Sequence, residues 1–466
     1  MSRWPALETR ELPPAPSWWQ AIGVGVVVMG MAMGTGELIL WPHLVTKFGL
    51  GILWFALVGF GLQYFINQEI ARHTAATGES FFTASARLFG FLPPFWILAA
   101  ILLYIWPGWA SALGTILAQL FGFGSHITWG WGSLALALAV TFMGHTAYHV
   151  LERTLKVIVP IFLLLLLVVS FHNLSFAILK EAFLGLTNFG YIPEGIDMNV
   201  LLGAIVFAGA GGMLNLCISL WYRDKGLGMA HYVGRISNPV TGVPEAVAVT
   251  GYRFHITEDS LKRWRGWMRY ILIDQGLIFF ALGLLSLVLL SVNAYVVLTP
   301  LGIVPEGTRV AVAQSEIFAQ EWGIVGEKLY LIMAYLMLFS VMWTVIDALT
   351  RIVSDIVHTN TRVGPFAERF HWLKEISIHH LYYGLIVLVI LMQALLLPFN
   401  QPLTFLVLSS SLGGITMALY TPILLYMNKR TLPKELRPGS ISTIALIVAT
   451  IFYAFFGIQS ILATIG

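Results

Sequence analysis

One carboxylate lies well inside a long apolar run near the start of the chain. Glu37 directly follows Gly34, Thr35 and Gly36 in a run that begins near residue 20. An ionisable side chain within an apolar span is costly and is expected to serve a function. Glu37 could bind a cation, or it could cap a second half of the helix through free backbone N–H groups; the two roles are compatible.

A second glycine cluster occupies the middle of another apolar run. It reads Gly209-Ala210-Gly211-Gly212 and is followed by Met213 and Asn215. Glycine disfavours a helix interior, so the cluster predicts either an unwound segment or close helix packing. Unwinding would free backbone carbonyls to face a cation. Met213 and Cys217 share a helical face and offer soft ligands to a transition metal, although such residues are also ordinary core residues.

Three other ionisable residues are candidates for gating or coupling. His43 follows Pro42 and is expected toward the outer end of the first run, whereas Asp274 lies a turn or two inside a later run. Asp347 is followed at intervals of four by Arg351 and Asp355, a spacing that places the three on one helical face. We expect a ladder of ion pairs there, near the cytoplasmic end of its span.

The amino-acid composition shows that these residues belong to a membrane protein. Of the 466 residues, 58% are hydrophobic and only 11% are charged, against about 25% charged in globular proteins. The chain is therefore an integral membrane protein whose first partner is the lipid bilayer. A net charge of +3 argues against a nucleic-acid partner, and one cysteine excludes an intrachain disulfide. The sequence has no Walker-type nucleotide loop, and we expect no bound cofactor.

Eleven runs are long enough to cross a bilayer, for which about 20 apolar residues are needed. With the N-terminus in the cytoplasm, 22 of the 26 Lys and Arg residues fall on the inside. This bias predicts a multi-pass protein of the plasma (inner) membrane with its C-terminus outside. The runs lie near residues 20–46, 49–70, 93–120, 127–147, 154–172, 199–222, 268–293, 325–350, 378–398, 403–427 and 440–465.

The two glycine clusters occupy corresponding places if the first ten spans form two copies of one unit. Each cluster then falls in the first helix of its copy, a pattern typical of inverted-repeat secondary transporters that bind substrate at the bilayer midplane. We therefore expect a single membrane transport domain over residues 1–466. Its repeats would cover about 18–172 and 199–427, with an extra helix at 440–465.

Several segments, taken in order, resemble the natural resistance-associated macrophage protein (Nramp) family of divalent-metal transporters. No single motif is specific, but their order and spacing together are. The matching segments include Gly23-Val24-Gly25 through Glu37, Lys47-Phe48-Gly49, Gln68-Glu69-Ile70-Ala71-Arg72, Ala110 to Thr115, and Leu406 to Ser411.

The resemblance implies an all-α, LeuT-like inverted repeat of 5+5 transmembrane helices plus an eleventh, with helices 1 and 6 broken. It implies a metal site at Glu37, Met213 and Ala210. The sequence also departs from the family: Gly34 stands where the family has its metal-binding Asp, Glu37 where it has Asn, and Leu214 follows Met213 in place of Pro-His. The family's proton-coupling groups have no counterpart either, so the resemblance supports the family's fold more strongly than the identity of the transported ion. The full predicted substrate-binding set is Gly34, Thr35, Glu37, Gly209, Ala210, Met213 and Asn215.

We therefore expect a transporter, not an enzyme, that moves a cation, first of all a divalent metal ion, by alternating access. The alternative keeps the scaffold and transports a small organic solute or another ion. A different class, a membrane histidine-box metalloenzyme, is suggested by the histidines on the predicted cytoplasmic side, but Ile376 stands where a His-x-x-His-His box needs its first histidine. Those histidines are His145, His149, His358, His371, His379 and His380.

Overall fold

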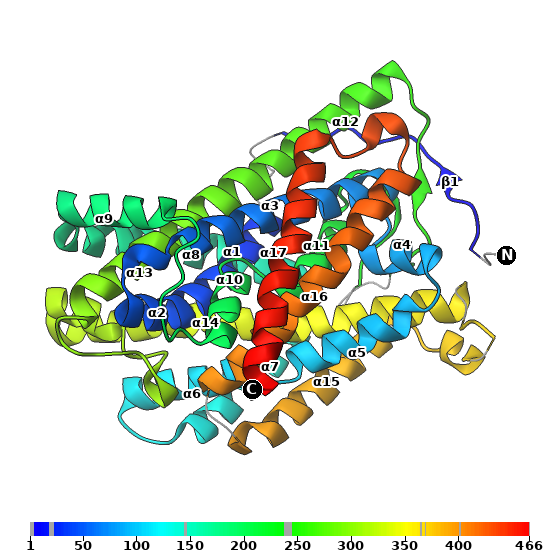
Figure 1. The fold of residues 1–466 in the computed structure, drawn as a ribbon. Helices are drawn as coiled ribbons and strands as arrows, with labels where there is room; N and C mark the ends of the chain where they lie inside the picture. The colour runs from blue at the N-terminus through cyan, green and yellow to red at the C-terminus, as the bar shows by residue number, and fades with distance from the viewer. Residues whose placement is uncertain are drawn as a thin grey trace.

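The computed structural model describes residues 4–17, 23–143, 147–236, 245–363, 366–368, 370–399 and 402–465. Long helices form nearly all of this structure and lie side by side, crossing at varied angles (Figure 1). The first half of the chain forms α1 (Val24–Ala32), η2 (Met33–Leu40), α2 (Trp41–Phe48), α3 (Trp54–Thr77), α4 (Phe81–Leu88), α5 (Leu92–Tyr104), α6 (Gly108–Phe121), α7 (His126–Met143), α8 (Ala147–Asn173) and α9 (Phe176–Thr187).

The second half begins with the shorter helices α10 (Met198–Val206) and α11 (Gly212–Lys225). It continues with α12 (Glu258–Ile271), η5 (Leu272–Leu282), α13 (Gly283–Leu298), α14 (Ser315–Arg362), α15 (Ile378–Leu396), α16 (Pro402–Thr431) and α17 (Ser440–Ile465). Two-residue strands β1 (Glu8–Thr9) and β2 (Tyr252–Arg253) pair in parallel, with Glu8 opposite Tyr252. The remaining elements are the 3₁₀ turns η3 (Leu50–Ile52), η4 (Gly228–Tyr232), η6 (Gly307–Arg309), η7 (His371–Glu375), η8 (Leu397–Phe399) and η9 (Lys434–Leu436).

The predicted spans agree with these helices. Within the described residues, nine helices are long and apolar enough to cross a membrane. The two other predicted spans correspond to α7, of 18 residues, and to the pair α10 and α11, of 9 and 14 residues. The all-α membrane fold is thereby confirmed.

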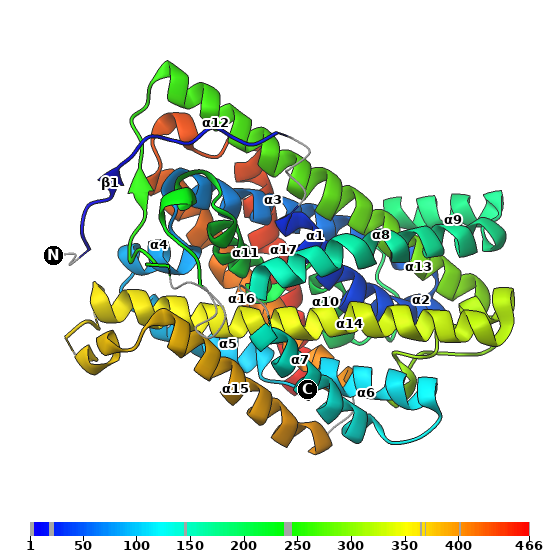
Figure 2. The same ribbon diagram turned by 180° about the vertical axis from the view of Figure 1, so that it is seen from behind.

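The outer surface of the bundle is apolar, as a lipid-facing surface must be. Large side chains such as Phe171 on α8, Leu395 on α15 and Ile441 and Ile451 on α17 are exposed. The interior holds the two segments that carry the glycine clusters. All residues of α1 and η2 are buried, as are residues 200–206 of α10 and 212–224 of α11. Both segments lie among the other helices when the molecule is seen from behind (Figure 2).

The ends of the α10–α11 pair are set by its sequence. The Asp197 side chain accepts a hydrogen bond from the backbone N–H of Asn199 at 2.8 Å and so caps the start of α10. At the other end, α11 stops at Gly226, which adopts the left-handed conformation that glycine favours at a helix C-terminus. What interrupts the pair in the middle is the second glycine cluster.

Candidate transport site

Helix 6 is broken at the predicted place. The helix α10 ends at Val206, α11 begins at Gly212, and residues 207–211 are not helical. Gly211 and Gly212 have φ values of +67° and +56°, a conformation that residues with a Cβ rarely adopt. The glycine cluster therefore permits the chain to leave one helix axis and start another within five residues.

One side chain bridges the two halves of the broken helix. Gln63 of α3 donates from its amide nitrogen to the Val206 carbonyl at 2.9 Å, and its amide oxygen accepts the Gly211 N–H at 2.9 Å. A break frees backbone donors and acceptors that must find partners in a dry interior. Gln63 supplies one partner to each half, and the sequence analysis missed it.

Two tyrosines complete the polar lining of the break. The Tyr104 hydroxyl accepts the Leu214 N–H at 2.8 Å, and the Tyr420 hydroxyl donates to the Gly212 carbonyl at 3.1 Å. The predicted site residue Asn215 donates to the Tyr420 hydroxyl at 3.4 Å, while its Oδ1 makes no hydrogen bond to the described part of the chain.

Helix 1 differs from the prediction of an unwound break. Its backbone stays helical between α1 and α2 but widens into the π-helical segment η2, where the Trp41 N–H bonds to the Gly36 carbonyl five residues earlier. A Cβ added at Gly36 would overlap the Phe207 carbonyl, and one at Gly34 would overlap the Val341 side chain. The glycines thus serve close contact with the helix 6 break and with α14, and the wider helix keeps most backbone hydrogen bonds internal.

Glu37 lies on this π-helical segment and is fully buried within the protein. One carboxylate oxygen accepts a hydrogen bond from the Ser286 hydroxyl on α13. The other oxygen, Oε1, has no hydrogen-bond partner among the described residues. The neighbouring Thr35 hydroxyl accepts from the Trp109 indole at 2.8 Å. Glu37 is therefore turned inward, with one oxygen open to a ligand or a proton.

The predicted metal ligands are brought into one region but do not form a complete metal site. Gly209, Ala210 and Met213 are buried at the break, against which Gly36 packs. The hydrogen bond of Glu37 runs to α13, not to the break. Among the described residues, no group of three or more His, Cys, Asp or Glu side chains could hold a metal ion.

The predicted gating residue Asp274 holds the start of helix 1. Its two carboxylate oxygens accept the N–H groups of Gly23 and Gly25 at 3.0 and 2.8 Å, and Oδ2 also accepts the Tyr222 hydroxyl of α11 at 2.6 Å. A carboxylate at a helix N-terminus satisfies free donors and interacts favourably with the helix dipole. Asp274 therefore ties helices 1, 6 and 7 together at one end of the bundle.

His43 lies at the other end of helix 1, beneath the loop between α13 and α14. Its Nδ1 is 2.8 Å from the Pro305 carbonyl, and the residue is 7% exposed. From the same loop, the Gln314 amide donates to the Leu38 carbonyl of η2 at 2.5 Å. This loop closes over the second end of helix 1.

The predicted ladder on α14 is present only in part. Arg351 donates through Nε to Asp347 at 2.7 and 2.9 Å, and through Nη1 to Asp224 at the end of α11. Asp355 bonds to Arg223 of α11 instead of Arg351. These five charged residues are all buried, so the ladder is a cross-link between helices 6 and 8.

The histidines do not assemble into a metal centre within the described residues. His379 Nε2 lies 3.1 Å from the Glu245 carbonyl, and His380 pairs with the Ser377 hydroxyl. His145 and the side chain of His149 lie outside the described part of the structure.

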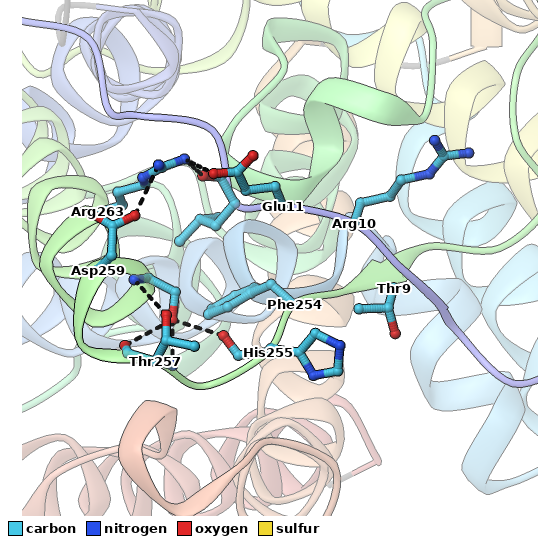
Figure 3. A pocket seen from close by; sticks show the side chains of 10 residues that line it. Thr9, Arg10, Glu11, Phe254, His255, Thr257, Asp259 and Arg263 are labelled. Carbon is cyan, nitrogen blue, oxygen red and sulfur yellow. Dashed lines mark hydrogen bonds and ion pairs between the residues drawn. The ribbon is translucent and has the colours of Figure 1, made fainter.

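A separate surface cavity of about 480 Å³ lies between the N-terminal segment and the start of α12 (Figure 3). In this cavity Arg263 pairs with Glu11 at 2.8 Å and with Asp259 at 2.8 Å. None of its lining residues belongs to the predicted site. The contacts instead fasten the segment that precedes helix 1 to the helix that leads into η5.

No protein-family model and no curated protein sequence matches this chain. Among solved structures, a manganese transporter from Eremococcus coleocola, in complex with an aromatic bis-isothiourea substituted compound, has a TM-score of 0.64 at 12% identity. The match covers 99% of this chain and 90% of that one. The transporter MhsT, in complex with L-phenylalanine, has a TM-score of 0.54 at 14% identity, covering 97% of this chain and 99% of that one. At these identities the likeness shows the fold alone, and that fold is the LeuT-like fold that the sequence predicts.

Proposed function

We propose that the protein is a secondary transporter that moves a cation across the membrane by alternating access. The cation would bind between η2 and the helix 6 break, with the open oxygen of Glu37 as its charged ligand. The observation that carries the proposal is this fully buried carboxylate with an unpartnered oxygen, on a segment packed directly against an interrupted helix. A buried carboxylate without a full set of partners requires a cation or a proton.

The closure of both ends of helix 1 supports alternating access. Asp274 fastens its first residues, and Gln314 and His43 hold its other half to a surface loop. A carboxylate enclosed in this way can exchange its ligand only when one set of contacts opens. By the distribution of Lys and Arg, we assign the Asp274 end to the cytoplasm.

Divalent metal ions are the first cargo to test. The fold likeness to a manganese transporter supports this choice, as do the carboxylate of Glu37 and the thioether of Met213. We retain the proposed single domain over 1–466, with repeats at about 18–172 and 199–427 and an added helix at 440–465.

A small organic solute or a monovalent cation is the second candidate. It is favoured by the small number of metal ligands in the described residues and by Gln63, which already occupies backbone groups at the break. Such a solute would use the polar lining of Asn215, Tyr104 and Tyr420.

Uptake into proteoliposomes tests the proposal. The panel contains Mn²⁺, Fe²⁺, Zn²⁺, Ca²⁺ and Na⁺, followed by amino acids, with and without a pH gradient. We compare wild type, Glu37→Gln and, as a matched control, Glu435→Gln, which removes an exposed carboxylate from the surface. We expect one class of cation to enter with wild type and the control and to be excluded by Glu37→Gln. Undiminished uptake by Glu37→Gln would remove Glu37 from the mechanism.

A further inference from the structure

A cavity of about 680 Å³ lies between α1, α8, η5 and the end of α11, and none of its lining residues belongs to the predicted substrate-binding set. This volume is within the range of small-molecule sites. Seven of the ten lining residues are apolar, and the three charged residues are Glu152, Lys156 and Lys225. The apolar lining residues are Val26, Met29, Val159, Pro160, Leu163, Ile278 and Leu282.

The charged residues gather at one end of the cavity. The Glu152 carboxylate accepts from Lys156 at 2.9 Å and from Lys225 at 3.0 Å. Gly23, the residue before α1, packs against Lys225 and Glu152. Asp274, at the start of η5, binds Gly23 and therefore marks the same end. The elements α1, α8 and η5 thus begin at the charged end.

The apolar residues follow farther along each element. On α8 the lining residues are at positions 152, 156, 159, 160 and 163, which share one helical face, and the two charged residues are the first two of this set. On α1 the lining residues are Val26 and Met29, and on η5 they are Ile278 and Leu282. The cavity is therefore amphipathic along its length, with a charged end, here called the mouth, and an apolar stretch beyond it, here called the interior.

The mouth has an excess of positive charge. Lys156 and Lys225 face Glu152, and Asp274, which binds Gly23 at the same end, adds a second carboxylate. Lys156 keeps 40% of its side chain exposed. Arg153, exposed on the next position of α8, adds a further positive charge nearby. By the distribution of basic residues, this end faces the cytoplasmic leaflet, which carries the anionic lipids.

We propose that this cavity binds one anionic phospholipid of the cytoplasmic leaflet, with its phosphate at Lys156 and Lys225 and an acyl chain between α1, α8 and η5. The charged end and the apolar lining suit a ligand with a negative head and an apolar tail better than a free anion. The head would lie beside Gly23, where Asp274 holds the start of helix 1. The lipid would therefore stabilise the closed arrangement of that end.

Native mass spectrometry of the purified full chain tests this assignment. The protein is titrated with dioleoylphosphatidylglycerol, with dioleoylphosphatidylcholine as the neutral lipid, and with soluble glycerol phosphate as the head without its tail. Lys156→Gln removes one charge from the mouth, and Leu163→Trp fills the apolar interior without changing charge. Lys429→Gln is the matched control, because Lys429 is exposed on the same predicted side and away from the cavity.

We expect wild type and Lys429→Gln to retain one phosphatidylglycerol and to prefer it to phosphatidylcholine. Loss of one lysine at an anionic headgroup should weaken retention about fivefold. Leu163→Trp should abolish it. The thermal stabilisation by phosphatidylglycerol should disappear in Leu163→Trp and be reduced in Lys156→Gln. Equal retention of the two lipids, unchanged retention by folded Leu163→Trp, or equal binding of glycerol phosphate would each overturn the proposal. These readouts do not depend on transport, so they stand apart from the proposed function.

Discussion

Replacing Gln63 by leucine tests how the broken helix is held. The substitution keeps the size of the side chain but removes both hydrogen bonds that bridge the break, one to the Gly211 N–H and one to the Val206 carbonyl, each at 2.9 Å. The two backbone groups remain buried and lose their partner. Each unsatisfied buried group costs about 1–3 kcal/mol, so the variant should lose about 2–6 kcal/mol of stability.

The assay is unfolding of the purified protein in dodecyl maltoside by added SDS, followed by circular dichroism. Gln119→Leu is the control, because the exposed Gln119 amide donates to Glu327 at the surface and its loss should change stability by no more than about 0.5 kcal/mol. Hydrogen exchange at residues 207–214 gives a second, local readout and should be faster in Gln63→Leu. Equal unfolding midpoints for the two variants, together with unchanged exchange at the break, would refute the bridging role of Gln63.

Two further substitutions examine the packing around the site. Gly36→Ala adds a methyl group where the Phe207 carbonyl lies, so we expect a marked fall in the thermal unfolding temperature. The control Gly132→Ala, whose added Cβ has no neighbour within 4 Å, should leave that temperature unchanged. Equal unfolding temperatures of the two variants would contradict the close approach of Gly36 to Phe207. Arg351→Met leaves the buried carboxylates of Asp347 and Asp224 without their cation and should destabilise the protein by about 3–5 kcal/mol in the SDS assay. Arg430→Met, on the surface, should leave the stability unchanged. Unchanged stability of Arg351→Met would mean that the buried network is not a structural cross-link.

The sequence predicts the membrane fold well because the signals for spans are local. Each span is a continuous apolar run, and the break in helix 6 follows from four residues, Gly209 to Gly212, two of which take a backbone conformation suited to glycine. The same reasoning predicts a break in helix 1 and is wrong there. Gly34 serves close contact with Val341 of α14, and Gly36 serves close contact with the Phe207 carbonyl at the helix 6 break, and both partners are distant in the sequence.

The partners of the site could not be predicted, since they come from distant parts of the chain. Gln63 and Gly211 are 148 residues apart, and Ser286 lies 249 residues from Glu37. The only feature of the sequence that could have indicated a role for Gln63 is that a glutamine lies inside an apolar span. Likewise, a spacing of four predicts the pair of Asp347 and Arg351, but the bond of Asp355 to Arg223 depends on how α11 meets α14.

Equilibrium binding of Mn²⁺ to purified protein, measured by titration calorimetry, tests the central claim most directly. Wild type and Glu435→Gln should each bind one ion. Glu37→Gln should bind at least about tenfold more weakly, because an interaction with a charged ligand contributes about 1.5–3 kcal/mol. Equal affinity of Glu37→Gln and wild type would contradict a cation site at Glu37, and the absence of binding to wild type would contradict a divalent metal as the cargo.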